Sequence, residues 1–131
     1  MPLNRVPLAG NQIVAMANVS LELKETFTAG AGDTTFIFNE LNVLGLPSLL
    51  YWLSLSSPVP NVNWTPLFAV TNTTVGGVTT PNWHDFNNGF ILVPGNVTTF
   101  SVRAAVALAG MRITVPAGNA VSIVTVITAG G

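Results

Sequence analysis

The sequence predicts an all-β protein: a single-domain, two-sheet sandwich, jelly-roll-like, with about eight short antiparallel strands and an extended N-terminal arm. Three observations lead to this fold class. Apolar and polar residues alternate within short segments, which is the period of a half-buried strand. Glycine, proline and asparagine separate these segments, as in turns. The 131 residues suffice for one domain with its own core, and helical periodicity is scarce.

Eight segments carry the strand pattern. In "VSLELKETF", for example, Val19, Leu21 and Leu23 alternate with polar residues. The first segment is long enough for two strands or for one strand with a bend. We expect strands at about 12–27, 34–43, 49–56, 64–72, 86–93, 97–106, 111–115 and 120–128.

Three segments share one turn pattern, in which a glycine next to asparagine or aspartate separates two alternating runs. They are "FTAGAGDTTFIF", "FILVPGNVTTFSV" and "ITVPAGNAVSIVTV". Glycine supplies a positive φ, asparagine or aspartate tolerates it, and proline fixes the entry to the turn. We interpret the three segments as hairpin-like corners. The last 21 residues are then a terminal hairpin with a loose "TAGG" end.

Helix signals are weak. "LNVLGLPSLLYWL" offers at most one helical turn, because Gly45 and Pro47 interrupt it. "VRAAVALAGM", residues 102–111, contains four alanines, so a short helix is the alternative there. The β-branched residues that follow favour a strand.

We divide the chain into an extended arm, residues 1–11, and a β-sandwich domain, residues 12–131. Pro2 and Pro7 prevent a regular strand ladder in the arm. Such a segment is either disordered or lies across a neighbouring subunit as an added edge. In the second case the contacts come from arm residues Pro2, Leu3, Arg5, Val6 and Pro7.

Charged residues are unusually rare, at 7% of the chain against about 25% in typical proteins. Serine, threonine and asparagine, 35 residues together, must supply most of the polar surface. The net charge of −1 gives no field that would attract nucleic acid or anionic lipid, and no long apolar run predicts a membrane span. We expect other protein to cover much of the surface. A monomer coated with threonine and asparagine is the alternative.

Groups for acid–base chemistry are few and scattered. The single histidine, His84, is adjacent to Asp85 in "TPNWHDFNNGF", which we interpret as a polar loop tip between Pro81 and Gly89. A metal pair or a general base is the alternative, but no second histidine exists to complete a zinc or iron site. The chain has no cysteine. We therefore expect no enzyme activity, no catalytic or metal-binding residue and no cofactor.

Glu22, Lys24 and Glu25 lie close together in the first predicted strand. Alternation puts Glu22 and Lys24 on one face, as in a solvated strand edge that discourages unwanted pairing. Glu22 and Glu25 are poor candidates for a glycosidase pair, because such carboxylates must face each other across the scissile bond.

Aromatic residues concentrate in the middle third, where no charged residue lies between Glu40 and Asp85. Tyr51, Trp52, Trp64 and Trp83 are the candidate anchors of self-association or of contact with a neighbouring protein. Two other interpretations remain open: packing of these rings in the core, and a sugar-stacking platform on an exposed sheet. A sugar site usually also needs carboxylates or arginine, and only Asp85 is close in sequence.

The short proline-bearing arm "MPLNRVPLAGNQ", the absence of cysteine and turns such as "VPGNVTTFSV" and "VPAGNAVSIV" resemble those of tailed-bacteriophage capsid cement, or decoration, proteins. The resemblance is one of style across the whole chain. It implies a non-enzymatic virion structural protein on the outer capsid surface, often a homotrimer, that stabilises the shell by bridging neighbouring major capsid proteins. The low charge departs from this pattern. The alternative is a carbohydrate- or receptor-binding β-module of a phage fibre or tail, or of an adhesin.

Overall fold

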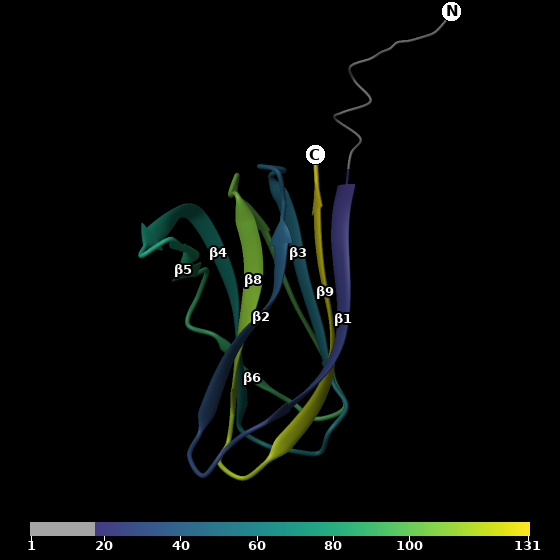
Figure 1. Cartoon of the computed structure of the whole chain (residues 1–131). Helices are drawn as coiled ribbons and strands as arrows, with labels where there is room; N and C mark the ends of the chain where they lie inside the picture. The colour runs from purple at the N-terminus through teal and green to yellow at the C-terminus, as the bar shows by residue number, and fades with distance from the viewer. Residues whose placement is uncertain (1–17) are drawn as a thin grey trace, which may run out of the picture.

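The computed structural model describes residues 18–131, which form two antiparallel sheets packed face to face (Figure 1). The predicted arm and its candidate contact residues Pro2, Leu3, Arg5, Val6 and Pro7, as well as the predicted domain boundary at residue 12, lie outside the described residues. The strands are β1 (Asn18–Thr28), β2 (Thr34–Asn42), β3 (Ser48–Leu55), β4 (Val62–Val75), β5 (Val78–Asp85), β6 (Phe90–Leu92), β7 (Val97–Arg103), β8 (Leu108–Val115) and β9 (Ala120–Gly130).

The strand order is that of a jelly roll. Sheet A has the order β1-β9-β3-β7, and sheet B has the order β2-β8-β4-β5, with β6 also paired to β4. From β1 to β4, and again from β6 to β9, each connection passes from one sheet to the other. Strands distant in sequence thereby become neighbours, such as β1 with β9 and β2 with β8. The predicted all-β sandwich is confirmed, and residues 18–131 contain no helix that could cross a membrane.

The three predicted hairpin corners are wrong in one respect: each joins strands of opposite sheets. The Pro116–Asn119 turn has the expected hydrogen bond from Asn119 N to Pro116 O, 3.2 Å long, but connects β8 of sheet B to β9 of sheet A. It packs against the β1–β2 connection, where Asp33 Oδ1 accepts a hydrogen bond from Ala117 N at 2.9 Å. Turn chemistry fixes the reversal of the chain but not the sheet that the next strand joins.

Other differences concern strand limits. The sequence prediction missed β5 and placed residues 81–85 in a loop. The residues 102–111 form no helix; β7 ends at Arg103 and β8 begins at Leu108. The "TAGG" end is not loose up to Gly130, because β9 runs to that residue and Ala129 is buried.

The core lies between the sheets and follows the alternation of the strands. On β9, Val121, Ile123, Thr125, Ile127 and Ala129 are buried, while the residues between them keep partial exposure. Trp64 and Tyr51 are the largest fully buried side chains. Aliphatic side chains from both sheets fill the remaining space.

One polar contact crosses the core between β2 and β9. Asn39 sits in a bulge of β2 with φ 59°, and its Nδ2 donates a 2.8 Å hydrogen bond to the buried Oγ1 of Thr125. Asparagine tolerates the left-handed backbone better than most residues do. The bulge therefore aims a polar side chain across the sandwich.

We expect Asn39→Ala to lower the free energy of unfolding by about 2–4 kcal/mol, because it strains the backbone and leaves the Thr125 hydroxyl without its partner. Asn39→Gly is the matched control, since it relieves the backbone strain and still removes the hydrogen bond. Urea unfolding of both variants measures the two contributions. Equal stability of Asn39→Ala and the unchanged protein would contradict this account.

A second polar contact joins β3 to β4. The hydroxyl of Tyr51 donates a 2.7 Å hydrogen bond to the carbonyl oxygen of Leu67. Burial raises the pKa of Tyr51 far above its ordinary value, because the phenolate form loses its hydration. The folded protein therefore holds this group neutral.

The raised pKa predicts a loss of stability at alkaline pH. Below about pH 10 the tyrosine is neutral in both the folded and unfolded states, and its full contribution to stability is present. Above that pH the unfolded chain ionises first, so the free energy of unfolding falls as pH rises. Tyr51 is the single tyrosine, so tyrosinate absorbance reports it alone. Ionisation near pH 10 in the folded protein would contradict the prediction; the urea-unfolded chain is the control.

Candidate assembly surfaces

The structure separates the four predicted contact aromatics into two groups. Tyr51 and Trp64 are 0% exposed, so they cannot anchor a surface contact, and that part of the prediction is wrong. Both occupy inward-facing positions, where Tyr51 packs edge-on against Phe86 and Trp64 stacks on Phe90. Trp52 and Trp83 keep partial exposure, and their role in contacts stays a prediction.

Trp52 lies on the outward face of sheet A. It is opposite Val126 of β9, and Val126 is opposite Glu22 of β1, so the three residues form one row across the sheet. Together with Leu50 they line an open depression. This depression offers one ring, two aliphatic side chains and one carboxylate to solvent.

Trp83 lies on the outward face of sheet B, where it covers its own chain. A Cβ atom on Gly110 of β8 would lie only 2.8 Å from the Trp83 ring, which shows how closely the indole approaches that strand. Leu67 and Ala69 lie at outward-facing positions next to this ring and are nonetheless buried. Trp83 therefore closes part of this outer face within the subunit.

His84 and Asp85 do not form the predicted loop tip, because both belong to β5. As neighbours on a strand they point to opposite faces. His84 stacks on Phe68, whereas Asp85 forms an ion pair with Arg112 of β8, with 2.7 Å between Asp85 Oδ2 and Arg112 Nη2. No group of three potential metal ligands occurs within residues 18–131. Sequence reasoning missed Arg112 because the pairing of β4 with both β5 and β8 creates this contact.

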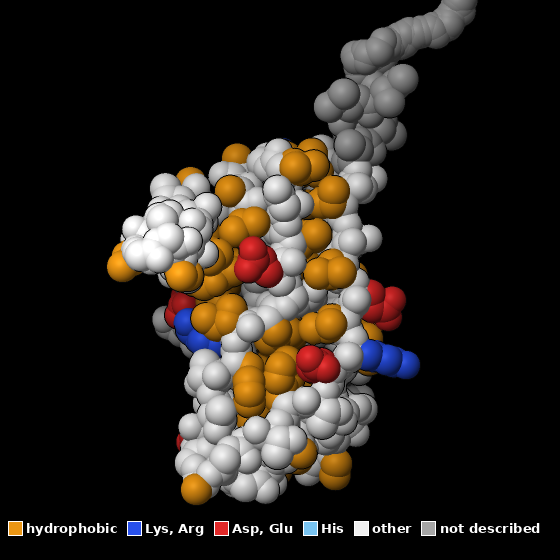
Figure 2. Space-filling model, viewed as in Figure 1, with side chains coloured by type: hydrophobic (Ala, Val, Ile, Leu, Met, Phe, Trp, Pro, Cys, Tyr) orange, Lys and Arg blue, Asp and Glu red, His pale blue; other side chains and the backbone are white. Residues whose placement is uncertain are grey.

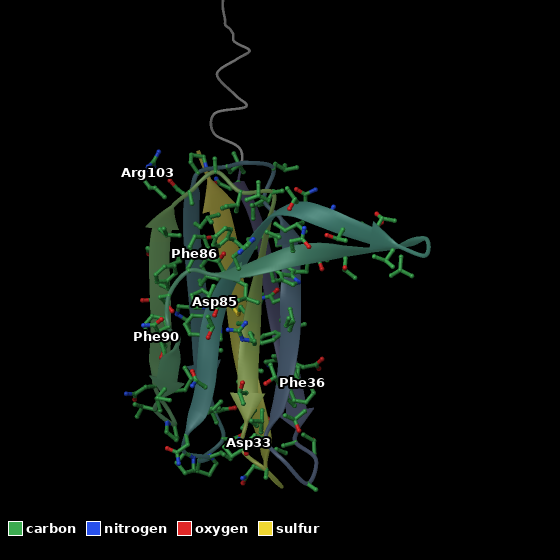
Figure 3. All side chains as sticks on the ribbon, turned by 90° about the vertical axis from the view of Figure 1, so that its left-hand side faces the viewer. Asp33, Phe36, Asp85, Phe86, Phe90 and Arg103 are labelled. Carbon is green, nitrogen blue, oxygen red and sulfur yellow. The ribbon has the colours of Figure 1, made fainter. Side chains whose placement is uncertain are left out.

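The exposed end of the β4–β5 hairpin, residues 70–80, was not predicted from the sequence. Beyond an irregularity between Ala69 and Asn72, the two strands leave the body as a two-stranded ribbon (Figure 3). Every residue from Val70 to Thr80 is exposed. Gly76 and Gly77 form the turn with φ values of 58° and 80°, as a two-residue hairpin with two positive φ values requires.

The exposed hairpin carries hydroxyl, amide and valine side chains and no charge. Thr74 and Thr79 share a 2.8 Å hydrogen bond across the strands, and Val75 and Val78 next to the turn are 73% and 64% exposed. A two-stranded ribbon without a covered face is marginally stable in water. "TTVGGVTT" was the available sequence signal, since two glycines between β-prone residues are typical of a hairpin.

Comparisons with known proteins support the fold and give no family. No protein-family model and no curated protein sequence matches the chain. VP2 in the subviral particle of infectious bursal disease virus is similar in structure, with a TM-score of 0.50 and 16% identity over 88% of this chain. The match covers 33% of the VP2 chain, so this protein spans about a third of its length.

Two further solved structures are similar at lower scores. One is a subunit of the disulfide-linked pili of Bacillus endospore appendages, with a TM-score of 0.46, 17% identity and 98% of both chains covered. The other is the Yersinia pseudotuberculosis-derived mitogen, with a TM-score of 0.43, 13% identity and 88% of both chains covered. At these identities the likeness concerns the fold alone. The protein belongs to the structural class of jelly-roll β-sandwiches.

Proposed function

We propose that this protein is a non-enzymatic structural subunit that assembles with other protein subunits. The observation that carries the proposal is the β4–β5 hairpin, whose residues 70–80 are uncharged, all exposed and extended away from the body. A ribbon of this kind gains a covered face only when another protein packs against it. Within this class we propose the role implied by the resemblance, a cement protein on the outer surface of a virus capsid.

The remaining surface of residues 18–131 supports an assembling subunit. Large hydrophobic side chains are exposed at separate places on the body, including Ile37 at 51%, Leu44 at 67% and Ile91 at 61%. Few charges surround them, and Arg112–Asp85 is the one ion pair within the described residues. The non-enzymatic part of the proposal is supported by His84 and Asp85, which point to opposite faces and so form no acid–base pair.

A carbohydrate-binding module is the second candidate, and the Trp52 row favours it. Trp52 and Leu50 form an apolar surface next to the Glu22 carboxylate, which could accept hydrogen bonds from sugar hydroxyls. The outward face of sheet A presents one aromatic ring rather than a row of rings. Quenching of tryptophan fluorescence by soluble glycans tests this candidate.

Sedimentation equilibrium of the full chain tests the proposed function. We expect an oligomer whose mass increases with protein concentration, since exposed apolar surface is buried on association. A monomer throughout the accessible concentration range would overturn the proposal. Antibody labelling of virus particles from cells that carry the gene tests the cement role, and absence of the protein from the outer surface of those particles would overturn that role alone.

A further inference from the structure

Strand β1 presents the longest regular free edge of the described sandwich. It pairs with β9 over 11 consecutive residues without a register shift, and within residues 18–131 no strand pairs with its other side. It contains no proline. The other edges are less suitable: β7 has seven residues, β2 contains the Asn39 bulge, and β5 belongs to the projecting hairpin.

Two of the three charges of β1 have opposite signs and flank one residue, Leu23. Leu23 is the central residue of Asn18–Thr28, and Glu22 and Lys24 flank it on the outward face. Both charged side chains are exposed, and neither has an ion pair within the described residues. A second copy placed antiparallel with full overlap would therefore bring Glu22 opposite Lys24 of that copy, and Lys24 opposite its Glu22.

The opposite charges of Glu22 and Lys24 select this register, because their pairing requires Leu23 as the centre. In the same register the described parts of the two strands overlap, with Asn18 opposite Thr28 of the second copy. A twofold contact of this kind is self-complementary, as isologous interfaces must be.

Apolar side chains along the same edge also lack cover. Figure 2 shows hydrophobic side chains in a band along this side of the molecule, where the β1 and β2 edges lie. The inward-facing residues of these two strands keep partial exposure at this edge: Val19, Leu21, Leu23, Phe36, Phe38 and Leu41. Joining two β1 edges would bring the two bands toward each other and remove apolar area from water.

We propose that two copies of this protein associate through β1, antiparallel and centred on Leu23, so that their two A sheets form one continuous eight-stranded sheet. The contact supplies main-chain hydrogen bonds along β1 and two Glu22–Lys24 ion pairs. It is separate from the hairpin contact of the proposed function. Glu25 opposes it, since this exposed carboxylate lies on the inward side and would face Leu21 of the second copy.

Charge reversal at Glu22 and Lys24 in the full chain tests this register. Glu22→Lys and Lys24→Glu each replace two opposite-charge pairs by two like-charge pairs, and we expect each to weaken dimerisation about tenfold. The double exchange restores both ion pairs and should restore the affinity. An equimolar mixture of the two single variants should form heterodimers, because every cross-strand pair is then of opposite charge. Native mass spectrometry counts each species.

Matched controls separate this contact from general charge effects. Arg103→Glu changes the net charge of the protein by the same amount as Lys24→Glu does. Arg103 lies on β7, at the opposite edge of sheet A, so this variant should leave dimerisation unchanged. Glu25→Ala should strengthen it, since that variant removes a carboxylate beside apolar surface. Thermal unfolding followed by circular dichroism verifies that each variant folds. High salt should weaken the differences among variants.

Each outcome of the charge-reversal experiment either supports or overturns the proposed β1 contact. Restoration in the double variant together with heterodimers in the mixture would support it. Equal dimerisation of all variants, or a dimer lost equally with Arg103→Glu, would overturn it. If association depends on the hairpin and ignores the β1 charges, this inference fails while the proposed function stands. If the unchanged chain is monomeric throughout, both fail.

Discussion

Gly89→Ala is expected to lower the free energy of unfolding by about 2–5 kcal/mol, combining backbone strain with overpacking. Gly89 has φ 89°, where an alanine side chain is unfavourable. A Cβ there would lie 2.7 Å from Thr65 Oγ1 and 2.9 Å from Asn63 Oδ1, with the Trp64 carbonyl oxygen at 3.3 Å. Urea unfolding followed by tryptophan fluorescence measures the loss.

Gly95→Ala is the matched control for this prediction. Gly95 has a similar φ of 82°, but a Cβ there meets nothing within 4 Å. It should therefore show the backbone contribution alone, about 1–2 kcal/mol. If both variants lose the same stability, the close packing of the Phe86–Phe90 connection against β4 contributes little, and the prediction is wrong.

Shortening the β4–β5 hairpin should weaken the hairpin-mediated step of self-association, while leaving the subunit folded and the separate β1 contact in place. Deletion of Thr74, Val75, Val78 and Thr79 removes two cross-strand pairs and keeps the Gly76–Gly77 turn. The deleted residues are all exposed, so the free energy of unfolding should change by less than about 1 kcal/mol. Burial of the two valines against a partner would supply about 3 kcal/mol, so the dissociation constant should rise about a hundredfold. Sedimentation equilibrium measures this constant.

A second variant distinguishes hairpin length from hairpin chemistry. Val75→Thr with Val78→Thr keeps the ribbon and its β propensity but removes its apolar side chains. We expect it to weaken association nearly as much as the deletion. Unchanged association in both variants would show that the hairpin contacts no partner, and would remove the main support for an assembling subunit.

The sequence predicts most strands because one face of each is buried, so hydrophobicity alternates along it. The jelly-roll strand order was harder to predict from the sequence. The Pro116–Asn119 turn looks like a hairpin turn, yet its flanking strands belong to different sheets and pair with β2 and β1. Local sequence specifies where the chain reverses, whereas burial of the whole set of apolar faces decides which sheet each strand joins.

The orientation and partners of the candidate surface residues were also hard to predict from the sequence. Tyr51 and Trp52 are adjacent aromatics, and alternation places them on opposite faces without showing which face is inward. The structure buries Tyr51, and its hydroxyl hydrogen-bonds the Leu67 carbonyl across the core, which offsets the cost of burying that polar group. Asp85 was recognised as a charged residue, but its partner Arg112 lies 27 positions away and becomes a neighbour only through the sheet.

The pairing of β1 with β9 sets Asn18 opposite Gly130, so both ends of the described chain emerge at one pole of the sandwich (Figure 1). A fluorescent protein fused after Gly131 would leave from this pole and keep clear of the opposite one, where Asp33 meets the Pro116–Asn119 turn. The same proximity of Asn18 and Gly130 suits circular permutation of residues 18–131, with a short linker across the pole and new ends opened elsewhere. Tags for microscopy and rearranged chains can thus be built without disturbing the distal pole.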